Sequence, residues 1–177
     1  MTGWRSRELG RQTRSSDTAN DPKILTCLWF DANGEDAAKF YVSLLPGSSV
    51  GHIGRYGKGG RMPEGLAMVV RFDLAGTPYM ALNGGPIFKQ SEATSIVVQC
   101  QDQAEIDRLW SALTADGGKE SMCGWLKDRF GVSWQIVPAI MGTWMSNPDP
   151  SVGARVMAAF MGMKKLDIAA LETAARG

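Results

Sequence analysis

Cys123 is the side chain with the clearest capacity for covalent chemistry in this sequence. It opens the stretch Cys123-Gly-Trp-Leu-Lys127-Asp, in which a lysine ammonium could lower the pKa of the thiol and yield a nucleophilic thiolate. The single histidine, His52, is the other candidate, as a general base, and it is not adjacent to Cys123 in sequence. A buried, inert thiol and a surface imidazole are the competing interpretations. Cys123 and His52 are therefore catalytic candidates without the neighbours of a catalytic pair.

The composition excludes several classes of function. The 177 residues, 44% of them hydrophobic, suffice for one domain or two fused half-domains with a large core. The formal net charge of +1 leaves no basic footprint for nucleic acid. No apolar run approaches the roughly 20 residues that span a bilayer. The three cysteines are too scattered for a disulfide framework, so we expect a cytoplasmic protein with neither nucleic acid nor membrane as partner.

The elements that must position any site follow one pattern written twice: a strand, a helix and then further strands. Residues 35–45, for example, place Ala37, Tyr41 and Leu44 on one helical face, and 132–137 alternate as a strand does. The first copy predicts strands over 24–30, 49–56, 66–74 and 79–83 around the helix 35–45. The second predicts strands over 94–100, 120–123, 125–127 and 132–137 around the helix 103–113. Two such units can pair to enclose a cavity.

Three regions follow from this pattern. Residues 1–22 are polar with almost no apolar periodicity, which favours a flexible N-terminal extension, the alternative being an arm that docks on a partner subunit through Trp4. They contain no apolar core of a secretory signal. Residues 23–137 hold the two repeats. Residues 138–177 predict a C-terminal helical extension outside the repeat.

Several strings in the sequence resemble a known family. Ala37-x-x-Phe40-Tyr41 after a first strand is similar to the opening of a vicinal oxygen chelate module, the fold of glyoxalase I, extradiol dioxygenases and the bleomycin- and fosfomycin-resistance proteins. Longer strings resemble its PhnB-like subfamily, also called the 3-demethylubiquinone-9 3-methyltransferase domain. They are residues 28–31 (Leu-Trp-Phe-Asp), 80–86 (Met-Ala-Leu-Asn-Gly-Gly-Pro), 123–135 (Cys-Gly-Trp-Leu-Lys-Asp-Arg-Phe-Gly-Val-Ser-Trp-Gln) and 163–168 (Met-Lys-Lys-Leu-Asp-Ile). The likeness covers roughly residues 23–174.

The resemblance implies an α+β fold, in which paired βαβββ modules form a curved, barrel-like sheet with C-terminal helices added. It also implies a homodimer, which the many Trp and Met residues favour because a small fold must cover them. By alignment with the superfamily's usual metal positions, the ligands here would be Thr26, Asn83, Ser95 and Gln135. None of these is histidine or carboxylate, and neutral oxygens bind transition metals poorly, so we expect no metal and no cofactor. If a metal were present, Gln135 and a carboxylate such as Glu92 would have to serve.

These positions still predict a ligand pocket. By the two-residue period of a strand, the same faces carry further side chains, which gives the predicted set Thr26, Leu28, Asn83, Ser95, Gln99, Ser133 and Gln135. Neutral polar groups among aromatic rings suit a small, uncharged or weakly polar organic ligand. A filled barrel, in which the polar groups only satisfy one another, is the alternative.

The sequence therefore predicts a small-molecule-binding protein that needs no metal. An enzyme acting on a small organic substrate in the same pocket is the second hypothesis. The methyl transfer implied by the family label is not expected, because the Gly-rich stretch 57–60 joins two short strands and precedes no helix, so a doubly wound nucleotide site is missing.

Overall fold

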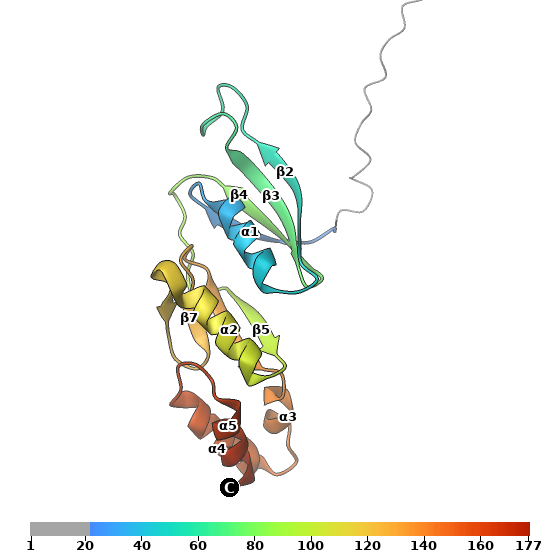
Figure 1. Cartoon of the computed structure of the whole chain (residues 1–177), viewed down its shortest axis with the longest axis vertical. Coiled ribbons are helices and arrows are strands. Elements are labelled where there is room, and N and C mark those ends of the chain that lie inside the picture. The colour runs from blue at the N-terminus through green and yellow to red at the C-terminus, as the bar shows by residue number, and fades with distance from the viewer. Residues whose placement is uncertain (1–21) are drawn as a thin grey trace, which may run out of the picture.

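The computed structural model describes residues 22–177, and these residues form two successive βαβββ modules followed by helices (Figure 1). The first module consists of β1 (Thr26–Phe30), α1 (Gly34–Leu44), β2 (Ser49–Arg55), β3 (Ala67–Leu74) and β4 (Thr77–Asn83). The second consists of β5 (Ser95–Cys100), α2 (Gln103–Thr114), the 3₁₀ turn η2 (Ala115–Gly117), β6 (Lys119–Glu120), β7 (Trp125–Lys127) and β8 (Ser133–Pro138). Of the extension predicted over residues 1–22, residues 1–21, including Trp4, lie outside the described residues.

Each module folds its own four-stranded sheet. The strand orders are β1-β4-β3-β2 and β5-β8-β7-β6, and in both sheets the first strand pairs in parallel with the last while the other pairs are antiparallel. The predicted α+β fold with paired βαβββ modules is confirmed. The two sheets remain separate within the chain, however, and do not close into one barrel.

One helix covers one face of each sheet, because each helix has a single apolar stripe. In α1 the buried stripe includes Ala37, Tyr41 and Leu44, and α2 buries residues at the same helical spacing. The α2 helix starts where Asp102 accepts a hydrogen bond from the backbone N–H of Glu105, an ordinary N-cap. Figure 1 shows α1 and α2 lying against their sheets. Within residues 22–177 the opposite sheet faces are left largely open, except at the end of β8, where Val137 packs against the core formed by the C-terminal helices.

A buried carboxylate joins the two modules. Asp128, in the turn between β7 and β8, accepts hydrogen bonds from the Tyr41 hydroxyl of α1 at 2.7 Å and from the Trp134 indole N–H at 2.9 Å. Its other oxygen accepts the backbone N–H groups of Phe130 and Val132. Burial raises the pKa of Asp128, although all four donors act in the opposite direction. Burial and the adjacent carboxylate also raise the pKa of Tyr41 well above its usual value.

Three helices complete the chain: α3 (Met141–Met145), α4 (Pro150–Met161) and α5 (Ile168–Arg176). They enclose a small second core of Trp144, Val156, Leu166 and Leu171, and Figure 1 places them beyond the second module. The predicted C-terminal helices are confirmed. None of the helices within residues 22–177 is long and apolar enough to cross a membrane.

Candidate functional site

The residues predicted for the pocket separate into two groups, because those of the first sheet lie on the face that α1 covers, whereas those of the second sheet lie on the face opposite α2. In the first sheet, Leu28 and Asn83 point toward α1, and Leu28 is part of the hydrophobic core. Thr26 lies on the same side of β1, at its exposed start. The open face of this sheet instead carries the alternate residues, Trp29 and Cys27 among them. The register expected for the first sheet was therefore wrong by one residue.

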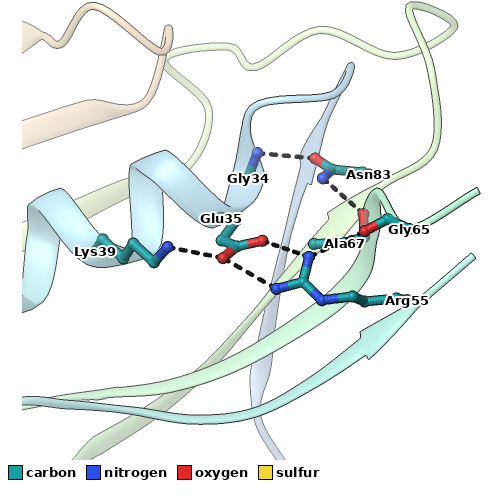
Figure 2. A network of polar contacts seen from close by, with 7 residues as sticks. All are labelled: Gly34, Glu35, Lys39, Arg55, Gly65, Ala67 and Asn83. Carbon is teal, nitrogen blue, oxygen red and sulfur yellow. Dashed lines mark hydrogen bonds and ion pairs between the residues drawn. The ribbon is translucent and has the colours of Figure 1, made fainter. Parts of the chain in front are cut away.

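Asn83 connects α1 to the sheet. Its side-chain oxygen accepts the backbone N–H of Gly34 at the start of α1, and its amide nitrogen donates to the Ala67 carbonyl, both at 2.8 Å (Figure 2). Asn83 is only 1% exposed, so it does not share a cavity with Gln135 as expected. Beside it, Glu35 pairs with Arg55 and Lys39, and these two cations lower the pKa of that carboxyl group.

In the second sheet, the four predicted residues Ser95, Gln99, Ser133 and Gln135 share the open face. The register pairs Ser95 with Ser133, and the Gln135 amide donates to the Ser95 hydroxyl at 2.9 Å. The residues between them point toward α2 and are buried, as Ile96 and Ile136 show. The structure thus brings together the second half of the predicted set and separates it from Thr26, Leu28 and Asn83.

A pocket of about 530 Å³ opens on this face of the second sheet. It is bounded by β6, β7, the turn that follows β6 and the linker between the modules, and its lining includes Glu92, Lys119, Cys123, Trp125, Lys127 and Ser133. Sequence reasoning placed Ser133 in a pocket and allowed Trp125 either to stack on an aromatic ligand or to pack in the core, but it did not place Lys119 or Lys127 there. The alternation of Trp125-Leu126-Lys127 was the available signal, because Leu126 is buried and its two neighbours must point the other way.

Some of the polar groups that line this pocket have an interaction partner and one has none. The Lys127 ammonium pairs with the Glu92 carboxylate at 2.5 Å, and that hydrogen bond lowers the pKa of Glu92, which lies exposed on the linker. The Ser133 hydroxyl is buried and has no hydrogen-bond partner within the described part of the chain. An unpaired buried hydroxyl is unusual and suggests a missing partner.

Cys123 lies at the edge of the pocket in a bend rather than in a strand. The strand predicted over 120–123 is wrong beyond Glu120, because Cys123 and Gly124 both adopt positive φ and donate their N–H groups to Met163 and Lys164 of the tail. The thiol contacts the Met161 sulfur at 3.7 Å, while the Lys127 ammonium is paired with Glu92.

His52 does not meet Cys123 in this fold. It lies exposed on β2, the edge strand of the first sheet, whereas Cys123 belongs to the second module. The structure therefore assembles no Cys–His pair from the two catalytic candidates.

The superfamily's metal position has no suitable ligands here. Both polar atoms of the Asn83 side chain are used within the fold, and Gln135 bonds to Ser95. Among residues 22–177, no three His, Cys, Asp or Glu side chains converge in a way that could hold a metal ion. The donor set present is one that transition metals bind weakly.

The two βαβββ modules define the class of the protein, the vicinal oxygen chelate superfamily. More narrowly, the chain belongs to the 3-demethylubiquinone-9 3-methyltransferase family, whose sequence profile matches residues 22–137.

Solved structures agree with this assignment. The PhnB protein of Bacillus cereus is 34% identical, with a TM-score of 0.62 over 67% of this chain and 100% of its own. Protein PA1353 of Pseudomonas aeruginosa is 25% identical, with a TM-score of 0.55 over 67% of this chain and 98% of its own. The fosfomycin resistance protein FosX of Listeria monocytogenes shares the fold, at 13% identity and a TM-score of 0.51 over 72% of this chain and 99% of its own. Among curated proteins, none matches the chain significantly.

Proposed function

We propose that this protein binds a small organic molecule in the pocket on the open face of the second sheet, and that it does so without a transition metal. The observation that carries the proposal is the pocket of about 530 Å³, a size that suits a small organic ligand. Its floor combines an indole ring with polar groups on β7 and β8, a mixture typical of small-molecule sites. The neutral donors at the superfamily's metal position support the metal-free part of the proposal.

The test is a metal analysis joined to a ligand screen on the full-length chain. We expect well below one equivalent of Zn, Ni, Fe or Mn after purification. We also expect thermal-shift hits whose binding is abolished by Trp125→Ala but not by Lys58→Gln, a substitution in the exposed loop between β2 and β3. One equivalent of metal, removed by a chelator together with ligand binding, would overturn the metal-free proposal. A screen in which no compound depends on Trp125 would overturn the binding site.

Methyl transfer, which the family's name implies, is not part of the proposal. The Gly-rich stretch 57–60 joins the antiparallel strands β2 and β3, and no helix follows it to bind a nucleotide-like methyl donor. Calorimetric titration with S-adenosylmethionine should therefore show no binding, and a micromolar dissociation constant would contradict this.

A second candidate function is an enzyme that uses Cys123, because that thiol lines the same pocket. The pairing of Lys127 with Glu92 argues against an activated thiolate. If Cys123→Ser abolished turnover of an identified substrate while leaving its binding intact, the enzymatic reading would replace simple binding.

We further propose that two copies of the chain form a homodimer and that the protein works in the cytoplasm. The open sheet faces support the dimer, because Val97 is 50% exposed on a sheet face that residues 22–177 leave uncovered at this position. The scattered cysteines support the compartment. Light scattering should give twice the chain mass of 19.1 kDa, and a monomer at micromolar concentration would contradict the dimer. A tagged copy should fractionate with cytosolic markers, and recovery outside the cytosol would contradict the compartment.

A further inference from the structure

One row of residues runs straight across the open face of the second sheet. The strand registers pair Ser95 with Ser133, Ser133 with Lys127, and Lys127 with Lys119. Since neighbouring strands lie about 4.8 Å apart, the row spans roughly 14 Å and places two hydroxyl groups beside two ammonium groups. Such a row consists of hydrogen-bond donors from end to end.

Both hydroxyl groups have a donor to spare. Ser133 is 1% exposed and lines the pocket, and its buried hydroxyl has no hydrogen-bond partner among residues 22–177. The Ser95 hydroxyl accepts its hydrogen bond from Gln135, so its own hydrogen is available to an acceptor. A ligand that supplies acceptor atoms at this place would satisfy a group that the protein leaves unpaired.

The charged side chains at the lysine end of the row favour a ligand with a single negative charge. Lys119 has no ion-pair partner within residues 22–177, and Lys127 has Glu92. Glu120 also lines the pocket, but its carboxylate pairs with the Lys164 ammonium at 3.5 Å. Counting that pair, the three ammonium groups and two carboxylates give this end of the pocket a net charge of +1. A single carboxylate neutralises that charge, whereas a phosphate dianion would leave an excess negative charge beside Glu92.

The next row along the sheet is suited to an apolar group. There the register places Trp125 beside Gln135, and Gln135 beside Val97. Of these three residues only Trp125 lines the pocket, and its indole face accommodates a flat apolar body by stacking. Gln135 and the half-exposed Val97 continue the same sheet face beyond the lining of the pocket. Taking the two rows together, we infer that the ligand of this pocket is an aryl monocarboxylate, its carboxylate on the serine–lysine row and its ring over Trp125. The inference rests on the proposed binding function and narrows the ligand to one chemical class.

The test compares a carboxylate with its uncharged counterpart on the full-length chain. Isothermal titration with 2-naphthoate should give a dissociation constant at least about tenfold lower than titration with 2-naphthamide, because only the first makes charge-assisted hydrogen bonds. Equal affinities would overturn the carboxylate and leave the binding function standing. Binding of neither probe would also overturn the aryl carboxylate, and the ligand screen would then decide the binding function separately.

Variants then locate the carboxylate. Ser133→Ala should weaken 2-naphthoate binding about tenfold and raise the melting temperature of the ligand-free protein by about 2–4 °C, since it removes a buried unpaired hydroxyl. Gain of stability with loss of affinity is not the result of structural damage. Lys127→Gln should weaken 2-naphthoate about tenfold and 2-naphthamide less than twofold.

Two exposed positions away from the pocket supply matched controls, Ser111→Ala on α2 and Lys58→Gln in the loop between β2 and β3, and both should leave affinity and melting temperature unchanged. Unchanged 2-naphthoate affinity in folded Ser133→Ala and Lys127→Gln would overturn the inference.

Discussion

Replacing Asp128 with asparagine tests whether one buried carboxylate holds the two modules together. The substitution keeps the shape of the side chain and one acceptor oxygen, which can still receive the N–H groups of Phe130 and Val132. It places an NH₂ group where the second oxygen now accepts from Tyr41 and Trp134. The Tyr41 hydroxyl can rotate and become an acceptor, but an indole N–H is only a donor and is left without a partner.

The size of the effect follows from those contacts. Leaving the buried indole N–H without an acceptor costs about 1–3 kcal/mol. The loss of charge also weakens the hydrogen bonds that remain, so the free energy of unfolding should fall by about 2–3 kcal/mol. In a chain of this length that corresponds to a fall in melting temperature of about 4–12 °C. Asp128→Ala leaves all four donors without an acceptor and should cost more.

Urea unfolding followed by tryptophan fluorescence measures the difference. Asp116→Asn is the matched control, because its carboxylate is 72% exposed and only pairs with Arg129 at the surface. That control should stay within about 0.5 kcal/mol of the wild type. If Asp128→Asn were as stable as the control, the junction argued from these four hydrogen bonds would be refuted.

The same pair of proteins has a predicted pH dependence. Burial raises the pKa of Asp128 in the folded state, so the folded state binds this proton more tightly than the unfolded chain does. The corresponding stability is present below the usual carboxyl pKa of about 4 and is lost as pH rises through the raised pKa. Asparagine does not titrate. The stability gap between wild type and Asp128→Asn should therefore narrow as pH rises from about 4 toward 7, and a widening gap would contradict the raised pKa.

A substitution and a labelling experiment test the start of α1 and the thiol. Gly34→Ala should lower the free energy of unfolding by about 1–3 kcal/mol, because its Cβ would lie 2.8 Å from the Asn83 oxygen. The control Gly142→Ala, whose Cβ would meet nothing within 4 Å, should be neutral or stabilising, and equal effects of the two substitutions in urea unfolding would count against the packing described. Iodoacetamide should label Cys123 no faster than an ordinary free thiol and should spare Cys100, which is buried and has a pKa raised to about 12; rapid labelling of Cys123 near neutral pH, read by mass spectrometry, would instead indicate an activated thiolate.

The elements and their repeat could be predicted because they depend on local periodicity. The helix expected over 35–45 spans Gly34–Leu44, and the helix expected over 103–113 spans Gln103–Thr114. In both, apolar residues recur every three or four positions and a local signal marks an end, Pro46-Gly47 after the first and Asp102 before the second. None of this information requires contacts far apart in sequence.

The position of Asn83 could not be predicted from its own strand. An asparagine at the end of β4 can face either a cavity or a helix, and the choice depends on which side has an unpaired partner. The N–H of Gly34, 49 positions away, is such a partner, because Asn33 makes no side-chain cap for α1. The bend at Cys123 has a similar cause, since the carbonyls that hold it belong to the tail at Met163 and Lys164.

The string over 123–135, which carries much of the family resemblance, shows why the likeness indicates fold more readily than ligand. Its residues alternate between two tasks. Leu126, Asp128 and Trp134 point inward and build the core and the module junction. Trp125, Lys127 and Gln135 point to the open face, together with the unpaired hydroxyl of Ser133.

Substituting the second group changes the pocket while the hydrogen bonds to Asp128 and the packing around Trp134 stay in place. Relatives that keep the inward residues can therefore keep the fold and bind different molecules. It follows that the ligand must be sought through the open-face residues and that the family name, which reflects the whole string, does not identify it.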